Sequence, residues 1–446
     1  MDTLLTLAAR LRSGTVTSVE LVERALERAA GGEGPRTFTR LFAERALATA
    51  QAHDGLRAAG APLSPFAGIP ITIKDLFDMV GEVTTAGSRV FEDAAPAQAD
   101  APAVARLRAA GFVVVGRTNM TEFAYSGLGM NAHYGTPRNP WDRATGRIPG
   151  GSSSGTAVAV ADGITAAGIG TDTGGSCRIP AALCGIVGFK PTASRIPRQG
   201  VVPLSTTLDS VGPLAASVEC CAILDAILEA GAPRVEDPLP IDGLRFGVPQ
   251  DYVTEGMDMT VAATHERALA RLSALGARLV PLSMPMLAEI PHINVKGGLV
   301  AAEAYAWHRP HLERTSHLFD PWILQRFEAG KSQSAADYIG TQRAREDMIE
   351  RVARETRGVD ALLMPTVPVV APAITELSDT ETANRTNLLL LRNPSLANFL
   401  DRCALSLPCH RQGDAPVGLM LMGEHGSDRR LLAIGKAVEL ALATHR

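Results

Sequence analysis

Residues 170–192 read G-T-D-T-G-G-S-C-R-I-P-A-A-L-C-G-I-V-G-F-K-P-T and follow an apolar run, residues 164–169, that predicts a strand. The consecutive Gly174 and Gly175 permit a sharp turn in which several main-chain N–H groups point the same way. Such a nest of donors suits a developing oxyanion, and Ser176 directly after it is placed to attack the carbonyl whose oxygen enters the nest. By itself the segment is also compatible with an ordinary tight turn.

A second Gly- and Ser-rich run, G-G-S-S-S-G at 150–155, lies shortly before this segment. No Lys follows it, so it does not match a phosphate-binding loop. Residues 151–155 match the G-x-S-x-G pattern of a nucleophile elbow, with Ser153 in the central position. That pattern needs a preceding strand, whereas the residues before it are loop-like. A flexible Ser/Gly loop is the alternative interpretation.

Further outward, helical patterns alternate with short apolar runs. A helix predicted over 102–110 stops at Gly111 and is followed by F-V-V-V-G, and this order occurs twice more, in residues 260–282 and 335–365. F-A-G-I-P-I-T-I-K at 66–74 predicts a turn and then a strand. Buried strands alternating with helices predict an α/β fold with a sheet covered on both faces.

The two ends of the chain fit the same alternation. Residues 1–50 predict helices, and Thr17 and Glu20 have the spacing of a capping box. Near the other end, P-V-G-L-M-L-M-G at 416–423 predicts a strand, and residues 427–443 predict a helix with Ser427 as its N-cap.

Composition excludes several classes of protein. Of 446 residues, 46% are hydrophobic and 20% are charged, which argues against a disordered chain, a collagen-like fibre or a small disulfide scaffold. The net charge of −4 does not suggest a nucleic-acid partner. Six cysteines without a C-x-x-C pair are typical of free thiols in a reducing cytoplasm. The N-terminus lacks the basic region of a signal peptide, and without an apolar run of 18 residues we expect no membrane span.

The chain has five Lys among 43 basic residues, so Lys74 at the end of the predicted strand I-P-I-T-I-K stands out. Burial lowers the pKa of a lysine, and a neutral buried amine can act as a base near pH 7. The alternatives are an ion pair with Asp75 and an amine that reaches solvent from the strand end.

The sequence gives little indication of a metal site, because His308 and His311 flank Pro310 and no H-E-x-x-H motif occurs. We therefore expect no metal site.

Together, Lys74 after its predicted strand, the G-G-S-S-S-G run at 150–155 and the segment at 170–192 resemble the amidase signature family. Supporting matches are G-R-T-N-M-T-E-F-A at 116–124, N-P-W at 139–141 and L-D-S-V-G-P at 208–213, and the resemblance covers about residues 5–440. Cys177 and Ser154 occupy positions that vary in the family. The resemblance implies a single α/β domain with a central twisted mixed sheet covered by helices on both faces. Its expected parts are N-terminal helices (1–60), a catalytic core (61–240), a helical, substrate-shaping region (241–400) and a return to the core sheet (401–446).

The resemblance also implies a Ser–cis-Ser–Lys triad. Ser176 is then the nucleophile, Ser152 the bridging hydroxyl with a cis peptide bond to the preceding Gly151, and Lys74 the base. Ser153 becomes a neighbour of the triad rather than its nucleophile. The resemblance also implies an oxyanion hole formed by the main-chain N–H groups of Thr173, Gly174, Gly175 and Ser176. Asp172 and Arg178 are expected to support this loop. Ala124 and Tyr125 are expected to line the substrate pocket.

The expected activity is hydrolysis of C–N bonds in small amides through a serine acyl-enzyme, extending to carbamates (urethanes), urea-like compounds or esters, without a metal or organic cofactor. The alternative is the glutaminase component of a tRNA-dependent amidotransferase, which needs partner chains. We otherwise expect a monomer or homodimer. The region 290–400 is expected to set substrate choice, with five aromatic residues forming either an apolar wall or simply core: Trp307, Phe319, Trp322, Phe327 and Tyr338.

Overall fold

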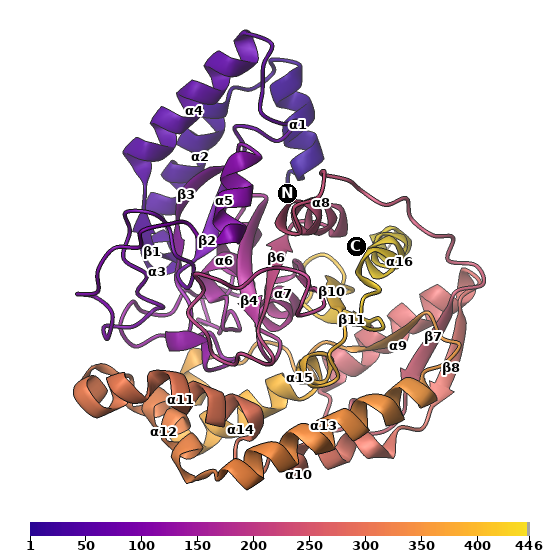
Figure 1. The fold of residues 1–446 in the computed structure, drawn as a ribbon. Helices are drawn as coiled ribbons and strands as arrows, with labels where there is room; N and C mark the ends of the chain where they lie inside the picture. The colour runs from indigo at the N-terminus through magenta and orange to yellow at the C-terminus, as the bar shows by residue number, and fades with distance from the viewer. Residues whose placement is uncertain (444–446) are drawn as a thin grey trace.

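Eleven strands form one mixed sheet in the computed structural model, which describes residues 1–443 (Figure 1). From one edge to the other the strands are β1 (Phe38–Leu41), β3 (Val113–Thr118), β2 (Pro70–Lys74), β4 (Ala167–Asp172), β6 (Ser210–Ala215), β5 (Val187–Lys190), β10 (Ala404–Pro408), β11 (Gly418–Met422), β9 (Ala361–Pro365), β7 (Arg245–Pro249) and β8 (Arg278–Leu282).

Strand direction decides which residues meet at each end of the sheet. β2 lies parallel to both β3 and β4, whereas β4 and β6 are antiparallel. Because the carboxyl ends of parallel strands lie at the same edge, Lys74 at the end of β2 lies near Asp172 at the end of β4. The loop that follows Asp172 therefore begins beside Lys74, and Ser210 at the start of β6 pairs with Asp172 across the ladder.

Both faces of the sheet are buried, because alternate residues of its strands enter different parts of the core. In β11, Leu419 and Leu421 pack into one apolar cluster, and Met420 and Met422 pack into another. All five β11 residues are buried. Side chains of successive strand residues point to opposite faces, so continuously apolar strands of this kind require cover on both sides.

Helices supply that cover (Figure 1). The N-terminal part contains α1 (Leu4–Arg12), α2 (Ser18–Ala30), α3 (Gly34–Thr37) and α4 (Ala43–Ala58). The helices packed along the rest of the sheet are α5 (Pro102–Ala109), α6 (Ser154–Ala161), α7 (Arg178–Cys184), α8 (Val218–Leu228), α9 (Met259–Ala274) and α16 (Asp428–Ala443), with α9 near the β8 edge. A further layer, in orange at the bottom of Figure 1, consists largely of α10 (Ile290–Ile293), α11 (Gly298–Thr315), α12 (Pro321–Ala329), α13 (Ala335–Glu355), α14 (Thr380–Arg392) and α15 (Pro394–Phe399).

Short 3-10 helices complete the elements: η1 (Glu122–Ala124), η2 (Pro285–Glu289), η3 (Ser316–Leu318), η4 (Gly330–Ser332) and η5 (Ile374–Leu377). The structure thus confirms the predicted α/β fold with a mixed sheet flanked by helices.

Local predictions hold in most places. The capping box is present, with Glu20 N–H donating to Thr17 Oγ1 and Thr17 N–H donating to the Glu20 carboxylate. Ser427 directly precedes α16, but its hydroxyl donates to the Glu424 carbonyl. The helical prediction for residues 1–50 missed β1, an edge strand of four residues. Residues 241–400 are not only helical, because they also contribute β7, β8 and β9 to the sheet.

All six cysteines are free thiols, and five of them are buried. Within residues 1–443 the structure contains no helix that could span a membrane.

The two-sided burial of the sheet predicts a large stability loss when a strand side chain is shortened. Leu421 in β11 is fully buried, so Leu421→Ala should lower the free energy of unfolding by about 2–5 kcal/mol through lost burial and a residual cavity. The measurement is urea unfolding. The matched control is Leu440→Ala on α16, where the side chain is 55% exposed and a change within about 0.5 kcal/mol is expected. Equal losses in both variants would contradict the assigned burial.

Candidate active site

Lys74 is fully buried at the end of β2, and its amine contacts two hydroxyl groups. Nζ lies 2.7 Å from Ser152 Oγ and 3.0 Å from Thr171 Oγ1. The neighbouring Asp75 instead binds Arg117 in a buried ion pair of 3.1 Å. Both alternatives for Lys74, an ion pair with Asp75 and an amine in solvent, are therefore wrong.

Burial lowers the pKa of Lys74 to about 7, although nearby acidic groups, Asp172 and Asp209 among them, act in the opposite direction. A charged ammonium loses its hydration when it is buried, and no residue among 1–443 forms an ion pair with this one. A pKa near 7 is compatible with a partly neutral amine at neutral pH, and Nζ lies within hydrogen-bond distance of Ser152 Oγ.

Ser152 is fixed by main-chain contacts on both sides. The Gly151–Ser152 peptide bond is cis, as the resemblance implies. Thr121 N–H donates to the Ser152 carbonyl at 3.1 Å, and Gly151 N–H donates to the Gly127 carbonyl at 2.8 Å. A Cβ at Gly151 would lie 2.5 Å from the nitrogen of Gly129, so this close approach requires glycine.

Ser153 does not stand at a nucleophile elbow, because no strand leads directly into it, although α6 begins at the next residue. Its N–H donates to the Ser176 carbonyl at 3.3 Å, and its hydroxyl lies 3.4 Å from the Thr171 carbonyl. Ser153 therefore connects the two Ser-containing segments and is a neighbour of the candidate triad.

The turn before Ser176 has the predicted glycine geometry, with Gly175 at φ +127°. The Gly175 N–H, however, donates to Asp172 Oδ1 at 2.8 Å, so it is already occupied. Among the described residues, none accepts a hydrogen bond from the N–H of Thr173, Gly174 or Ser176. Three of the four expected oxyanion donors are thus free in this structure, and the carboxylate of Asp172 occupies the fourth.

Asp172 and Arg178 form a fully buried ion pair that holds this turn. The carboxylate accepts from Arg178 Nε at 3.0 Å and Nη2 at 2.9 Å, and also from the N–H groups of Gly175 and Cys177. Asn398 adds a donor at 3.0 Å. Burial by itself would raise the pKa of Asp172, but the Arg178 charge and these hydrogen bonds outweigh it and lower the pKa to about 2.

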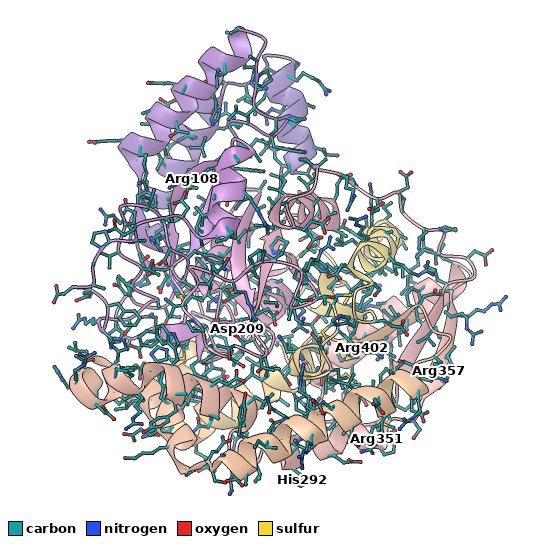
Figure 2. All side chains as sticks on the ribbon, in the orientation of Figure 1. Arg108, Asp209, His292, Arg351, Arg357 and Arg402 are labelled. Atoms are coloured by element: carbon teal, nitrogen blue, oxygen red, sulfur yellow. The ribbon has the colours of Figure 1, made fainter. Side chains whose placement is uncertain are left out.

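Asp209 holds the other side of the turn. Its carboxylate accepts hydrogen bonds from the Thr173 hydroxyl and from the N–H groups of Leu204 and Ser205. Burial raises the pKa of Asp209 to about 6, and the hydrogen bonds offset part of that shift. Figure 2 labels Asp209 near the middle of the molecule, between the sheet and the helical layer.

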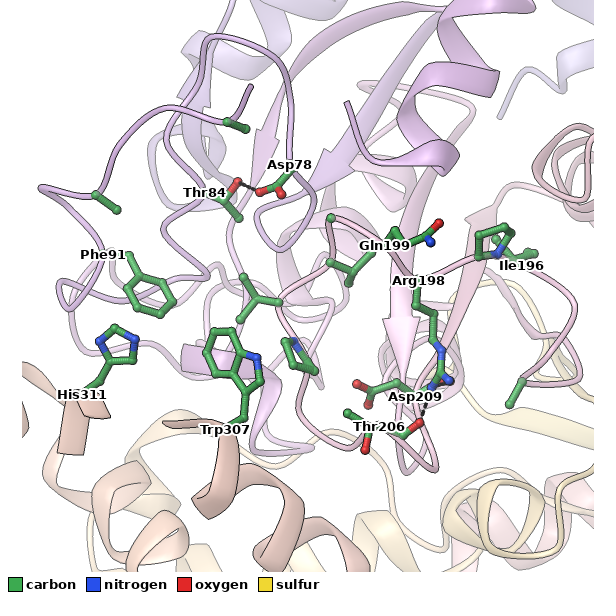
Figure 3. A pocket seen from close by; sticks show the side chains of 18 of the residues that line it. Asp78, Thr84, Phe91, Ile196, Arg198, Gln199, Thr206, Asp209, Trp307 and His311 are labelled. Carbon is green, nitrogen blue, oxygen red and sulfur yellow. Dashed lines mark hydrogen bonds between the residues drawn. The ribbon is translucent and has the colours of Figure 1, made fainter. Parts of the chain in front are cut away.

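Asp209 also borders a cavity of about 980 Å³ (Figure 3). Phe91, Trp307 and His311 form an aromatic side of this cavity, and Arg198 lies on the opposite side, next to Asp209. Lys74, Ser152 and Ser176 do not line it. The cavity therefore adjoins the turn at Asp209 without containing the candidate triad.

Ala124 and Tyr125 lie in the segment between Thr121, whose N–H donates to the Ser152 carbonyl, and Gly127, whose carbonyl accepts from Gly151 N–H. Phe123 and Ala124 have φ of +50° and +63°, a conformation that non-glycine residues rarely adopt. The Tyr125 ring lies 5.0 Å from that of Phe327.

The five aromatic residues of the region 290–400 do not form one wall. Phe319 and Phe327 pack around Phe123 and His308, whereas Trp307 is 39% exposed and lines the cavity. Trp322 packs against the apolar cluster that contains Phe319 and Phe327, and the Arg326 guanidinium stacks on its ring. The Tyr338 hydroxyl donates to Glu303.

Sequence reasoning missed Thr171, Asp209 and Asn398 as site residues. Thr171 and Asp209 lie inside the motifs at 170–192 and 208–213, which carry the resemblance. They could therefore have been named as site residues from the sequence. Asn398 lies 226 residues from Asp172, and no local pattern indicates this contact. Within residues 1–443, no group of three or more His, Cys, Asp or Glu side chains is arranged to hold a metal ion.

The buried ion pair predicts a large stability effect. Asp172→Asn should lower the free energy of unfolding by about 3–5 kcal/mol, because it leaves the Arg178 charge buried without a counter-charge. Asp172→Asn/Arg178→Met should lose less than the sum of the two single variants. Chemical unfolding measures both, and the control is Glu313→Gln, whose partner Arg309 is exposed, so stability should hardly change. Additive losses would contradict the pair.

Comparison with known proteins places this geometry in a family. The chain matches the sequence profile of the Amidase family over residues 20–432. It is 37% identical to 2-amino-5-chloromuconic acid deaminase of Comamonas testosteroni, covering 97% of this chain and 94% of the relative. It is 36% identical to a glutamyl-tRNA(Gln) amidotransferase subunit of Roseiflexus sp. (strain RS-1), covering 98% and 95%.

A solved amidase structure superposes with a TM-score of 0.90 at 35% identity, covering 99% of this chain and all of that one. Sequence and fold thus agree over nearly the whole length of the chain. The chain belongs to the Amidase family, and it is an amidase-signature hydrolase of C–N bonds.

Proposed function

We propose that the protein hydrolyses small linear amides through an acyl-enzyme on Ser176, with Ser152 as the bridging hydroxyl and Lys74 as the base. The observation that carries the proposal is the buried Lys74 amine, 2.7 Å from Ser152 Oγ and without an acidic partner in residues 1–443. An amine with a pKa of about 7 is suited to accept a proton at neutral pH.

The reaction begins when Lys74 Nζ takes the proton of Ser152, which in turn takes the proton of Ser176. Ser176 Oγ then attacks the substrate carbonyl, and the free N–H groups of Thr173, Gly174 and Ser176 stabilise the oxyanion. Lys74 returns the proton through Ser152 to the leaving nitrogen, the C–N bond breaks, and ammonia or an amine departs. Water attacks the acyl-enzyme by the same proton route and releases the acid and Ser176.

The same chemistry accommodates carbamate, urea-like and ester carbonyls, because Ser176 attacks the carbonyl carbon in each case. The Lys74 amine and the two serine hydroxyls carry the proton for all of these classes. Which class the enzyme prefers therefore depends on contacts beyond the triad.

A second candidate function is the glutaminase component of a tRNA-dependent amidotransferase. The Roseiflexus relative, a subunit of such an enzyme by name, matches this chain along nearly its full length at 36% identity. Purification distinguishes the two functions. An isolated chain that hydrolyses simple amides supports the stand-alone amidase, whereas glutamine hydrolysis that requires added partner chains supports the second candidate.

Covalent labelling tests the nucleophile. A fluorophosphonate should form one adduct, on Ser176, and Ser176→Ala should abolish labelling and lower kcat by on the order of 10³-fold or more. Mass spectrometry of the digested protein maps the adduct. Ser153→Ala is the matched control, and it should still be labelled on Ser176. An adduct on Ser153 in the wild-type protein would overturn the assignment.

The pH dependence tests the base. Because burial lowers the pKa of Lys74 to about 7, the neutral amine is lost as pH falls through 7, and kcat/KM should fall about tenfold per pH unit below it. Lys74→Ala should remove most of the activity. The Lys190→Met variant is the control, because burial also lowers the pKa of Lys190, to about 8, but Lys190 is not part of the proposed triad. An acid limb that disappears in the Lys190 variant would contradict the role of Lys74.

A further inference from the structure

Glu303 on α11 is a half-buried carboxylate that accepts hydrogen bonds on both of its oxygens. Ser205 Oγ donates to Oε2 at 2.6 Å, and Thr207 N–H donates to the same oxygen at 2.9 Å. The hydroxyls of Thr207 and Tyr338 both donate to Oε1. Most of these donors therefore belong to one short loop, residues 204–209, which directly precedes β6.

These hydrogen bonds keep Glu303 ionised. Burial by itself would raise the pKa of Glu303, but the hydrogen bonds from Ser205 and Thr207 outweigh it, so the pKa is lowered. Hydrogen bonds to an ionised acceptor are stronger than those between neutral groups. Because Tyr338 lies on α13, two helices of the helical layer take part in holding the 204–209 loop.

Within the loop, Ser205 joins Glu303 to Asp209. The Ser205 hydroxyl donates to Glu303, and it accepts from Leu208 N–H at 3.2 Å. Asp209 Oδ2 accepts from Ser205 N–H at 3.1 Å and from Leu204 N–H at 3.0 Å. One residue thus binds both carboxylates, the first through its hydroxyl and the second through its N–H, so the position of Asp209 depends on Glu303.

Asp209 passes this constraint to the turn that begins at Asp172. Its Oδ1 accepts from the Thr173 hydroxyl. The N–H of Thr173 has no acceptor among residues 1–443, and it is one of the proposed oxyanion donors. The Asp172 carboxylate instead binds the N–H groups of Gly175 and Cys177. The contact with Asp209 therefore fixes Thr173, whereas Asp172 fixes the later part of the turn.

We propose that Glu303 is a positioning residue for the oxyanion-stabilising N–H of Thr173. It acts through the 204–209 loop and the carboxylate of Asp209. This inference rests on the proposed acyl-enzyme function and specifies how the helical layer supports it. An N–H donor lowers the barrier most when it is already aimed at the place where the charge develops. Releasing the loop weakens this donor and leaves the proposed triad intact.

The rate of fluorophosphonate labelling tests this role. Ser176 Oγ bonds to phosphorus as fluoride leaves, and the charge that develops on the phosphoryl oxygen needs the oxyanion donors. The bimolecular rate constant therefore reports the donors, whereas the final extent of labelling reports the fraction of folded sites. Glu303→Leu should lower the rate constant about tenfold or more. A folding defect alone would lower only the extent.

The conservative variant Glu303→Gln should recover part of the rate, because its amide oxygen still accepts from Thr207 N–H. It also carries the test by itself if Glu303→Leu does not fold, with an expected loss of about threefold. Rate constants equal to that of the wild-type protein in the folded Glu303 variants would overturn the proposal.

A double-variant cycle tests the route through Asp209. Thr173→Val removes the hydroxyl that Asp209 binds and keeps the main-chain N–H. Thr173→Val/Glu303→Leu should lose less than the product of the two single effects, and effects that multiply would contradict the route. The matched control is Glu313→Gln on the same helix, in an exposed ion pair with Arg309, and its rate constant should not change. An equal loss in this control would also overturn the role of Glu303.

Failure of the proposed function is a separate outcome of the same experiment. A wild-type protein without an adduct on Ser176 removes the acyl-enzyme, and the role of Glu303 falls with it. Labelling of Ser176 in the wild-type protein at a rate that Glu303→Leu does not change removes only the role of Glu303 and leaves the proposed function standing.

Discussion

The site depends on the buried ion pair between Asp172 and Arg178. The carboxylate accepts two main-chain N–H groups of the turn as well as the guanidinium, so one side chain shapes the loop before Ser176. Arg178 in turn donates to the Pro394 carbonyl and to Asn398, which joins the turn to α15, more than 200 residues later in the chain. A buried charge pair is unfavourable unless its hydrogen bonds are satisfied, and here the surrounding donors and acceptors satisfy them.

Burial, and not the charges around this pair, favours a neutral lysine at position 74. Lys74, Arg178 and Lys190 are all fully buried, and Asp172 holds its negative charge firmly. Burial lowers the pKa of Lys190 to about 8, and the Arg178 charge contributes to that shift, so cations are costly here. For Lys74, by contrast, Asp172 acts against the effect of burial, so the low pKa of this amine comes from desolvation alone.

Much of the fold could be predicted from residue patterns. Continuous apolar runs such as that of β11 predict strands buried on both faces, and the spacing of Thr17 and Glu20 predicts a capping box, because both depend on neighbours within a few residues. The edge strand β1 was missed because four residues are too few for a clear period. The engaged Gly175 N–H was also missed, because the conformation of a single glycine turn decides which acceptor its N–H reaches.

The sequence by itself determined the family, the α/β class and the residues Lys74, Ser152 and Ser176 as candidates, since short motifs carry residue identity and spacing. Only the tertiary structure decided that Lys74 is buried beside Ser152, which lowers its pKa, and that Asp209 accepts a hydrogen bond from Thr173. Burial and charge compensation depend on groups distant in the chain, and these groups meet only when β2, β4 and the segments around Ser152 and Asp209 pack together.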